Sequence, residues 1–275
     1  MESRRFNGRP AKPLAPYIGG KRHLADALIA RIERIPHDLY AESFVGMGGV
    51  FLRRRPSTVE VINDINRDVA TLFRVLQCHY VAFLDMIRWQ LTTRADFERL
   101  METDPETLTD LQRAARFLYL QRTAYGGKVA GRSFGVSPMT PARFDISRLA
   151  PLLEDVHSRL SGVVIECLPY ADFIGRYDRP ETLFYLDPPY FGSERDYGAS
   201  VFARSDFERL AGILAAIKGR FILSLNDTPE VRAIFGCFIF EEVKTTYSIG
   251  PETHPAAELI IMDRRSAEDG RGLLL

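Results

Sequence analysis

Residues 182–190 read TLFYLDPPY, a short apolar run that ends in a proline-rich turn. The run has the length and the aromatic content of a buried strand, and Pro188 and Pro189 cannot extend it because they lack an amide hydrogen. Open α/β folds bind their ligands at the carboxyl ends of such strands. We therefore expect Asp187 and Tyr190 to lie at the ligand-binding edge of a sheet.

On both sides of this run, short segments rich in β-branched and aromatic residues alternate with longer helical patterns, which favours a mostly parallel sheet covered by helices. The last two expected strands follow each other without a helical pattern between them, so they would pair antiparallel at one edge. The sequence thus predicts an α/β fold with an antiparallel edge hairpin. The expected strands are residues 39–44, 59–63, 163–168, 183–186, 221–225, 238–246 and 258–262.

Residues 73–157 separate the second and third expected strands and show mainly helical patterns. Within this part, residues 124–132 (AYGGKVAGR) are rich in glycine and basic, which indicates a tight turn or hairpin. We expect residues 73–157 to form a small helical insertion into a main domain made of residues 1–72 and 158–275. Apolar residues at helical spacing mark residues 68–90, 94–102 and 108–122.

The composition is that of a globular protein, with 46% hydrophobic and 26% charged residues among 275, which excludes the disordered, fibrous and disulfide-scaffold classes. No apolar run is long enough to cross a bilayer, and the basic N-terminus is not followed by the apolar segment of a secretory signal. We therefore expect a cytoplasmic protein without a membrane partner. The cysteines and histidines are scattered, so no bound metal is expected.

The formal net charge of zero hides an uneven distribution. Residues 113–148 hold seven Lys or Arg against one acid, Asp145, and residues 96–110 just before them are acidic. A basic stretch of this kind suits a nucleic-acid partner, although charge alone fits two solvated helix faces equally well.

A glycine-rich turn, FVGMGG at residues 44–49, follows the first expected strand and precedes an expected helix start at residues 50–54. Gly46 and Gly48 would let the backbone approach a ligand closely. Asp64 ends the next strand, where its carboxylate could accept hydrogen bonds from the hydroxyls of a ribose. This pair of features predicts a nucleoside cofactor, but it also occurs in NAD enzymes and in plain turns.

The residues around this turn favour S-adenosylmethionine over NAD. A bulky Phe51 stands near the position of the third glycine of a dinucleotide-binding motif. NAD would also need a pyrophosphate site at a helix N-terminus, whereas S-adenosylmethionine carries no phosphate and needs space, ribose acceptors and an apolar wall. Phe44 can supply that wall.

The Asp-Pro-Pro-Tyr turn suits the handling of an exocyclic amino group. Its prolines fix the backbone, so the Asp187 carboxylate and the Pro188 carbonyl become rigid acceptors for the two amino hydrogens. The nitrogen lone pair is then free to attack a methyl group in line, and Tyr190 offers a stacking face for a base flipped out of its helix. The alternative is a turn that only ends a strand.

With these motifs in this order, the sequence resembles the Dam-like group of N6-adenine DNA methyltransferases, from Pro16 to about Met262. The resemblance implies a Rossmann-like S-adenosylmethionine-dependent methyltransferase sheet, with residues 73–157 as the target-recognition domain. It implies site-specific methyl transfer from S-adenosylmethionine to adenine N6 in double-stranded DNA, with no protein partner required. Two alternatives remain, cytosine-N4 methylation, which more often uses Ser-Pro-Pro-Tyr, and a non-catalytic DNA-binding protein that retains the fold.

The resemblance also assigns site residues. Catalysis is assigned to Asp187, Pro188, Pro189 and Tyr190. Cofactor binding is assigned to Tyr17, Lys21, Phe44, Gly46, Gly48, Asp64, Ile65, Asp172 and Asp187. DNA binding is assigned to Arg122, Tyr125, Lys128 and Arg132.

The sequence departs from the family pattern in two of these places. Tyr17 stands where the family usually has tryptophan. The hairpin differs from the family pattern after Gly127, so the recognition sequence, which in the family is most commonly GATC, stays open. An alternative role for Asp172, in place of cofactor binding, is that of an acidic residue that stabilises the first turn of a helix. No cleavage motif is visible, and the sequence does not say whether a separate restriction enzyme accompanies the protein.

Overall fold

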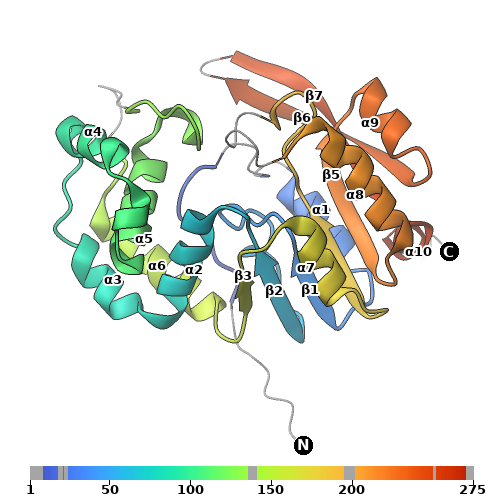
Figure 1. Cartoon of the computed structure of the whole chain (residues 1–275), viewed down its shortest axis with the longest axis horizontal. Helices are drawn as coiled ribbons and strands as arrows, with labels where there is room; N and C mark the ends of the chain where they lie inside the picture. The colour runs from blue at the N-terminus through green and yellow to red at the C-terminus, as the bar shows by residue number, and fades with distance from the viewer. Residues whose placement is uncertain are drawn as a thin grey trace, which may run out of the picture.

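The computed structural model describes residues 9–17, 21, 24–135, 141–194, 202–249 and 252–270. Within these residues the chain forms one sheet of seven strands in the order β3-β2-β1-β4-β5-β7-β6 (Figure 1). The strands are β1 Leu39–Glu42, β2 Val59–Asn63, β3 Val164–Glu166, β4 Thr182–Leu186, β5 Arg220–Asn226, β6 Ile239–Ile249 and β7 Glu252–Met262.

The pairing of the strands confirms the expected α/β fold. Strands β3, β2, β1, β4 and β5 run parallel to one another, and β7 lies antiparallel to both β5 and β6. The edge hairpin is longer than the sequence indicated, since β6 and β7 each contain 11 residues. The central position of β1 and β4 places the ends of both strands at the middle of the carboxyl edge.

Helices cover both faces of the sheet and form the insertion that lies to the left of it in Figure 1. The helices before β3 are α1 Ala25–Ile32, α2 Arg67–Cys78, α3 Tyr80–Ile87, α4 Arg94–Glu102, α5 Asp110–Thr123 and α6 Ile146–Arg159, with short 3-10 turns η1 Pro105–Thr107 and η2 Tyr125–Gly127. The later helices are α7 Tyr170–Tyr177, α8 Arg204–Ala216, α9 Pro229–Ile234 and α10 Arg264–Gly270.

Alternation along the strands sends side chains into two cores, one on each face of the sheet. Ala41 and Phe184 face a core closed by α7 and α8. Tyr40 and Leu183 face the other core, which continues through α1 and the helices of the insertion. Both faces of the central strands are therefore buried, which explains why residues 183–186 are aliphatic or aromatic without interruption.

Two expectations about helices are wrong. Residues 50–54 form turns rather than the start of a helix. Leu52 N donates to Gly48 O and Arg54 N donates to Val50 O, but these bonds do not continue as a helix, and the chain passes into β2 soon afterwards. Residues 68–90 form two helices because the backbone leaves helical geometry at His79 (φ −132°, ψ 29°), which lets α3 turn and pack against α5 and α6. Within the described residues, no helix is long and apolar enough to span a membrane.

Candidate active site

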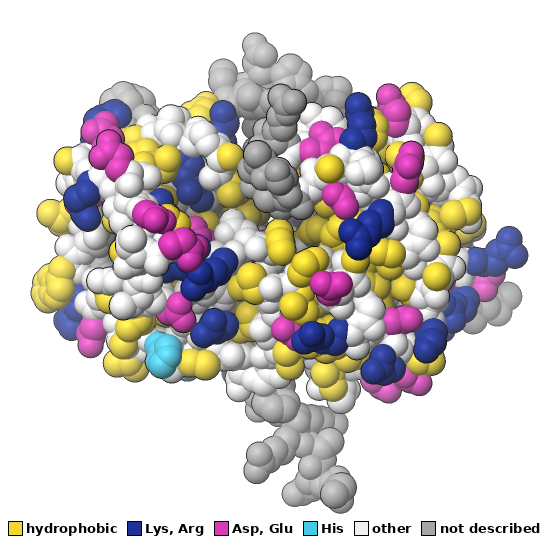
Figure 2. Space-filling view, viewed as in Figure 1, with side chains coloured by type: hydrophobic (Ala, Val, Ile, Leu, Met, Phe, Trp, Pro, Cys, Tyr) yellow, Lys and Arg dark blue, Asp and Glu magenta, His cyan; other side chains and the backbone are white. Residues whose placement is uncertain are grey.

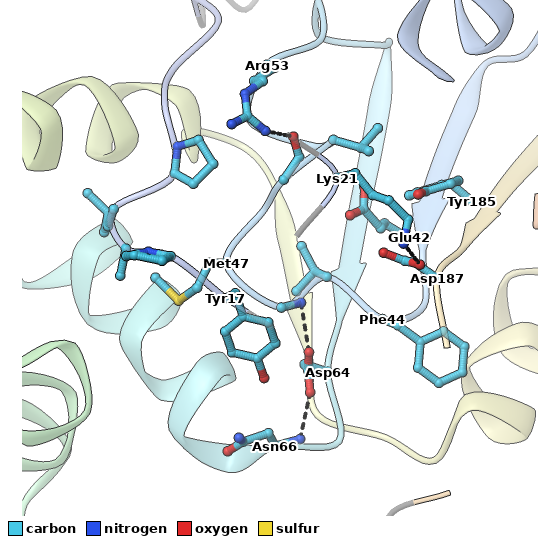
Figure 3. A pocket seen from close by; sticks show the side chains of 18 of the residues that line it. Tyr17, Lys21, Glu42, Phe44, Met47, Arg53, Asp64, Asn66, Tyr185 and Asp187 are labelled. Carbon is cyan, nitrogen blue, oxygen red and sulfur yellow. Dashed lines mark hydrogen bonds and ion pairs between the residues drawn. The ribbon is translucent and has the colours of Figure 1, made fainter. Parts of the chain in front are cut away.

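A cavity of about 970 Å³ opens at the carboxyl ends of β1, β2 and β4 (Figure 3). Its volume lies at the upper end of the range for small-molecule sites. The glycine turn, the end of β2, the N-terminal segment and the Asp-Pro-Pro-Tyr turn all contribute to its walls. The residues expected at a cofactor that line it are Tyr17, Lys21, Phe44, Gly46, Asp64, Ile65 and Asp187.

The glycine turn has a conformation and a close contact that require glycine. Gly46 has φ +50°, and a Cβ atom there would lie 3.0 Å from the ring of Tyr17. Gly48 has φ +72°, but its missing side chain makes room for Leu52, and Gly48 does not line the cavity. Gly46 thus lets the Tyr17 ring lie against the turn, while Gly48 lets Leu52 pack against the side of the turn that faces away from the cavity.

Asp64 is held in a fixed orientation at the end of β2. Its carboxylate accepts hydrogen bonds from the amides of Gly46 (2.8 Å) and Asn66 (2.9 Å). Burial raises the pKa of Asp64 to about 6, in spite of these two bonds, which lower it. The group is therefore mainly ionised at neutral pH, and each oxygen keeps a lone pair for a hydroxyl donor in the cavity.

Glu42, at the end of β1, is another acid in the cavity wall, and no motif in the sequence singled it out. It is buried and accepts a 2.5 Å hydrogen bond from the hydroxyl of Tyr40. Burial raises the pKa of Glu42 to about 8, against the opposing effects of Tyr40 and Arg54. Glu42 is therefore mainly protonated at neutral pH.

The Asp187 carboxylate is anchored through one oxygen. Lys21 Nζ lies 2.7 Å from Asp187 Oδ1, and the hydroxyl of Ser224 donates to the same oxygen at 3.1 Å. Tyr185 contacts Ser224 at 3.0 Å and extends this buried polar chain. Burial raises the pKa of Asp187, and the ammonium group of Lys21 opposes the shift. Lys21, expected at the cofactor, thus lies directly on the predicted catalytic acid.

The backbone after the Asp-Pro-Pro-Tyr turn is clamped by Asn226, from the end of β5. The Phe191 amide donates to Asn226 Oδ1 at 2.9 Å, and Asn226 Nδ2 donates to the Phe191 carbonyl at 3.0 Å. Tyr190, next to this clamp, accepts a 2.6 Å hydrogen bond from Lys21 Nζ. Residues from β4, β5 and the N-terminal segment therefore fix the turn together.

Some predicted residues lie elsewhere. Asp172 is exposed in the first turn of α7 and does not line the cavity, a position that fits its alternative interpretation as a helix first-turn acid. Pro189 lines the cavity, whereas Pro188 and Tyr190 lie beside it. The structure therefore brings the glycine turn, Asp64 and Asp187 together but leaves Asp172 outside.

The residues that sequence reasoning missed are single polar side chains on strands. Glu42, Ser224 and Asn226 stand in no recognisable motif, and their importance follows from the strand order, which brings β1, β4 and β5 side by side. The one available signal was their position at the carboxyl ends of expected strands.

Comparison with known proteins gives a direct answer about the family. A family model described as D12 class N6 adenine-specific DNA methyltransferase matches residues 17–249, which is most of the chain. The chain belongs to this family. The expected Dam-like relationship is thereby confirmed, and the protein is an adenine-specific DNA methyltransferase that uses S-adenosylmethionine.

Individual relatives of this methyltransferase are distant but cover most of it. Type II methyltransferase M.CviBI of Paramecium bursaria Chlorella virus NC1A is 22% identical over 241 residues, covering 86% of this chain and 91% of the relative. Retron Ec67 DNA adenine methylase of Escherichia coli is 25% identical, covering 73% and 74%. Type II methyltransferase M.MjaIII of Methanocaldococcus jannaschii is 23% identical, covering 71% and 75%.

The cavity of the methyltransferase fits S-adenosylmethionine in size and in the chemistry of its walls. Asp64 offers ionised acceptors suited to ribose hydroxyls, and Tyr17, Phe44 and Ile65 supply aromatic and aliphatic surface. The strand order places this cavity at the same edge as Asp187. The residues present are therefore consistent with the cofactor of the family.

The predicted DNA-contacting residues of the methyltransferase differ in their surroundings. Tyr125 is 53% exposed and Lys128 is exposed. Arg132 is half-buried, and its guanidinium donates to Lys128 O and to Gln121 Oε1, both at 3.1 Å. Arg122 donates to the carbonyls of Leu14 and Arg143, so its guanidinium ties backbone segments together.

The basic stretch seen in the sequence does not form one basic surface. Arg113 is buried between Asp68 (2.5 Å) and Glu106 (2.9 Å), and Arg116 donates to the Leu100 carbonyl. On the face shown in Figure 2, Lys and Arg side chains are interspersed with Asp and Glu. Some of the basic side chains of residues 113–148 are therefore engaged inside the protein, and the others are exposed.

Proposed function

We propose that the methyltransferase acts on double-stranded DNA without a protein partner, and that Asp187, Pro188 and Tyr190 hold the target adenine. The observation that carries this proposal is the anchoring of Asp187. Within the described part of the chain, Lys21 and Ser224 both contact Oδ1, which leaves Oδ2 as an acceptor at the cavity.

The adenine N6 group carries two hydrogens, which suit Asp187 Oδ2 and the Pro188 carbonyl. Donating both directs the nitrogen lone pair away from these acceptors and toward the cavity. When bound there, S-adenosylmethionine supplies an electrophilic methyl group. The nitrogen would gain the methyl group as the methyl–sulfur bond breaks and its electron pair stays on the departing sulfur. The nitrogen then gives up one N–H proton, and Asp187 Oδ2 is placed to accept it. Burial raises the pKa of Asp187, which makes its carboxylate a better base than an exposed aspartate.

Tyr190 provides the stacking face for the flipped adenine. Its hydroxyl is fixed by Lys21, so the ring has a defined plane before the base arrives. A fixed aromatic plane lowers the ordering cost when the base stacks on it.

We assign target recognition to residues 73–157. The exposed Tyr125 and Lys128 on the hairpin that follows α5 are the candidates for DNA contact, with Tyr125 stacking on or wedging beside a base and Lys128 contacting phosphate. Arg122 and Arg132 support this hairpin through backbone and side-chain bonds.

Methyl transfer from tritiated S-adenosylmethionine to mixed plasmid DNA tests the substrate. We expect incorporation into duplex DNA, N6-methyladenine on nucleoside analysis, and little incorporation into the same DNA kept single-stranded. Sequencing that detects modified bases, with DNA from an expressing host, would then give the target site. Equal rates on both forms of DNA would contradict the proposed double-stranded substrate.

Replacing Asp187 by Ala tests the catalytic assignment. We expect D187A to lose methyl transfer by a factor on the order of 1,000 or more, because it removes both an acceptor and the base. Cofactor binding, measured by calorimetry, should stay within about tenfold, since Tyr17 and Asp64 are untouched. Activity near that of the unmodified enzyme would refute the role given to Asp187.

A further inference from the structure

We infer that Glu258, on the edge strand β7, is a positioning residue of the catalytic centre, where it orients Tyr190 and Lys21. Glu258 lies in no motif recognised in the sequence, and it is distant along the chain from every residue assigned to the site. The inference rests on the proposed roles of Asp187 and Tyr190.

The strand order brings Glu258 to the site. Its backbone pairs with Asn226 at the end of β5, the residue that clamps the backbone after the Asp-Pro-Pro-Tyr turn. The Glu258 side chain is almost completely buried, with 2% of it exposed. A carboxylate is rarely buried to this degree without partners that repay its desolvation.

Those partners are Tyr190 and Lys21. Glu258 Oε2 lies 3.9 Å from Lys21 Nζ, and Glu258 is hydrogen-bonded to Tyr190. Lys21 Nζ is in turn 2.7 Å from Asp187 Oδ1 and 2.6 Å from the Tyr190 hydroxyl oxygen. Lys21 thus lies between two carboxylates, one on the catalytic turn and one on the edge strand.

The direction of each hydrogen bond follows from the donors present. An ammonium group can only donate, so the Tyr190 oxygen accepts from Lys21. The single Tyr190 hydroxyl hydrogen is then directed to the Glu258 carboxylate. Burial raises the pKa of Tyr190 far above its ordinary value, so the hydroxyl keeps this hydrogen at neutral pH.

With Lys21 on one side and Glu258 on the other, the Tyr190 ring is held in one plane. Without Glu258, the hydroxyl hydrogen loses its acceptor and Lys21 loses one of its two anions. The ring that stacks on the flipped base would then be free to turn, and the ammonium group could move away from Asp187. Glu258 therefore acts on the reaction through Tyr190 and Lys21 without touching the substrate.

Two substitutions separate the two contacts of Glu258. Glu258→Gln keeps an oxygen that can accept from Tyr190 but removes the charge, whereas Glu258→Ala removes both. We expect E258A to lower the single-turnover rate of methyl transfer by about 10- to 100-fold, the equivalent of one lost hydrogen bond to a charged group. E258Q should recover at least part of that loss. The cofactor Kd should stay within about threefold for both variants, since Glu258 does not line the cavity.

A fluorescent base analogue at the target adenine gives a readout besides activity. If Glu258 orients the Tyr190 ring, E258A should change the fluorescence of 2-aminopurine in the bound duplex, because the flipped base loses its fixed stacking face. In a double-mutant cycle, E258A should cost less in the Tyr190→Phe background than in the unmodified enzyme, since the phenylalanine already lacks the hydroxyl and only the contact of Glu258 with Lys21 is left to lose. Glu242→Gln, at an exposed position on the adjacent strand β6, is the matched control and should match the unmodified enzyme in every assay.

The outcomes are distinct. An E258A variant that transfers methyl groups at the unmodified rate overturns the inference, as does a full additive loss in the double mutant or a loss of cofactor binding equal to the loss of rate. If D187A is inactive while E258A is fully active, only the role of Glu258 fails. If D187A remains active, the proposed function fails with it.

Discussion

Glu42 changes its ionisation strongly between the unfolded and the folded chain. Its side chain is buried at the end of β1, next to Tyr40, and burial raises its pKa from 4.5 to about 8. Between these two pH values the folded protein keeps a proton on Glu42 that the unfolded chain has lost. The stabilising effect is thus complete below pH 4.5 and is lost as the pH rises to about 8.

Glu42→Gln should remove this part of the pH dependence, because an amide does not ionise. The unmodified enzyme should lose up to about 1.4 kcal/mol of unfolding free energy per pH unit through this one group, and E42Q should not. Urea unfolding of both proteins without cofactor, at pH 5 and at pH 8, measures the difference. Glu33→Gln, at an exposed position, is the matched control. A stability difference between E42Q and the unmodified enzyme that does not change with pH would refute the assignment.

At the scale of elements, hydrogen bonds from α5 connect the N-terminal segment to the hairpin after α5. Gln121 is fully buried in α5, and its Nε2 donates to the carbonyls of Pro16 (2.8 Å) and Gly127 (2.7 Å). Gly127 has φ +69°, and a Cβ atom there would lie 2.9 Å from the backbone of Pro16. Tyr17, the next residue, lies against the glycine turn of the cavity, so the hairpin and the cofactor wall share a support.

Gly127→Ala should therefore affect the cavity, whereas Gly126→Ala should not. Both glycines have positive φ, but a Cβ atom at Gly126 has no neighbour within 4 Å. We expect G126A to cost about 1 kcal/mol of stability from backbone strain alone. G127A should also push Pro16 and Tyr17 aside and raise the cofactor Kd by about tenfold, measured by calorimetry. Equal cofactor affinities for the two variants would contradict this coupling.

The elements themselves were largely predictable, because strands buried on both faces and helices with one apolar face leave clear patterns. The strand at residues 182–186 and the glycine turn followed from such patterns and from local motifs. Glu42, Gln121 and Glu258 could not be found in the same way. Each is a single polar residue in a regular element, and its partners come from distant segments that only the strand order and helix packing bring near.

The break at His79 and the turns at residues 50–54 were missed because a local pattern is present there but indicates the wrong structure. Their apolar residues satisfy a helical pattern, but tertiary packing decides the backbone there. Val50, Phe51 and Leu52 are fully buried in turns that lead into β2. A local pattern does not say which of two compatible conformations buries its apolar residues better.

At the scale of the whole molecule, the insertion and the main domain share one core, and helix α6 leads from the insertion into a buried ion cluster of the main domain. The core that covers one face of the sheet continues into α5 and α6 without a boundary. Arg159, at the end of α6, makes a two-pronged contact with Glu60 on β2 (2.5 and 2.9 Å), and Arg54 also pairs with Glu60. The guanidinium groups of Arg54 and Arg159 lie 3.6 Å and 4.1 Å from the ring centres of Tyr40 and Phe51.

Glu60→Gln leaves two buried arginines without their anion. The way in which this destabilisation shifts unfolding tests whether the two parts unfold together. Removing one partner of a buried ion pair costs about 3–5 kcal/mol, whereas Asp85→Asn, which breaks an exposed pair with Arg88, should cost less than about 1 kcal/mol. Since the core is continuous, we expect E60Q to shift a single urea-unfolding transition, followed by both circular dichroism and the fluorescence of Trp89. An early, separate transition of Trp89, which lies just after α3, would instead mean that residues 73–157 fold independently of the sheet.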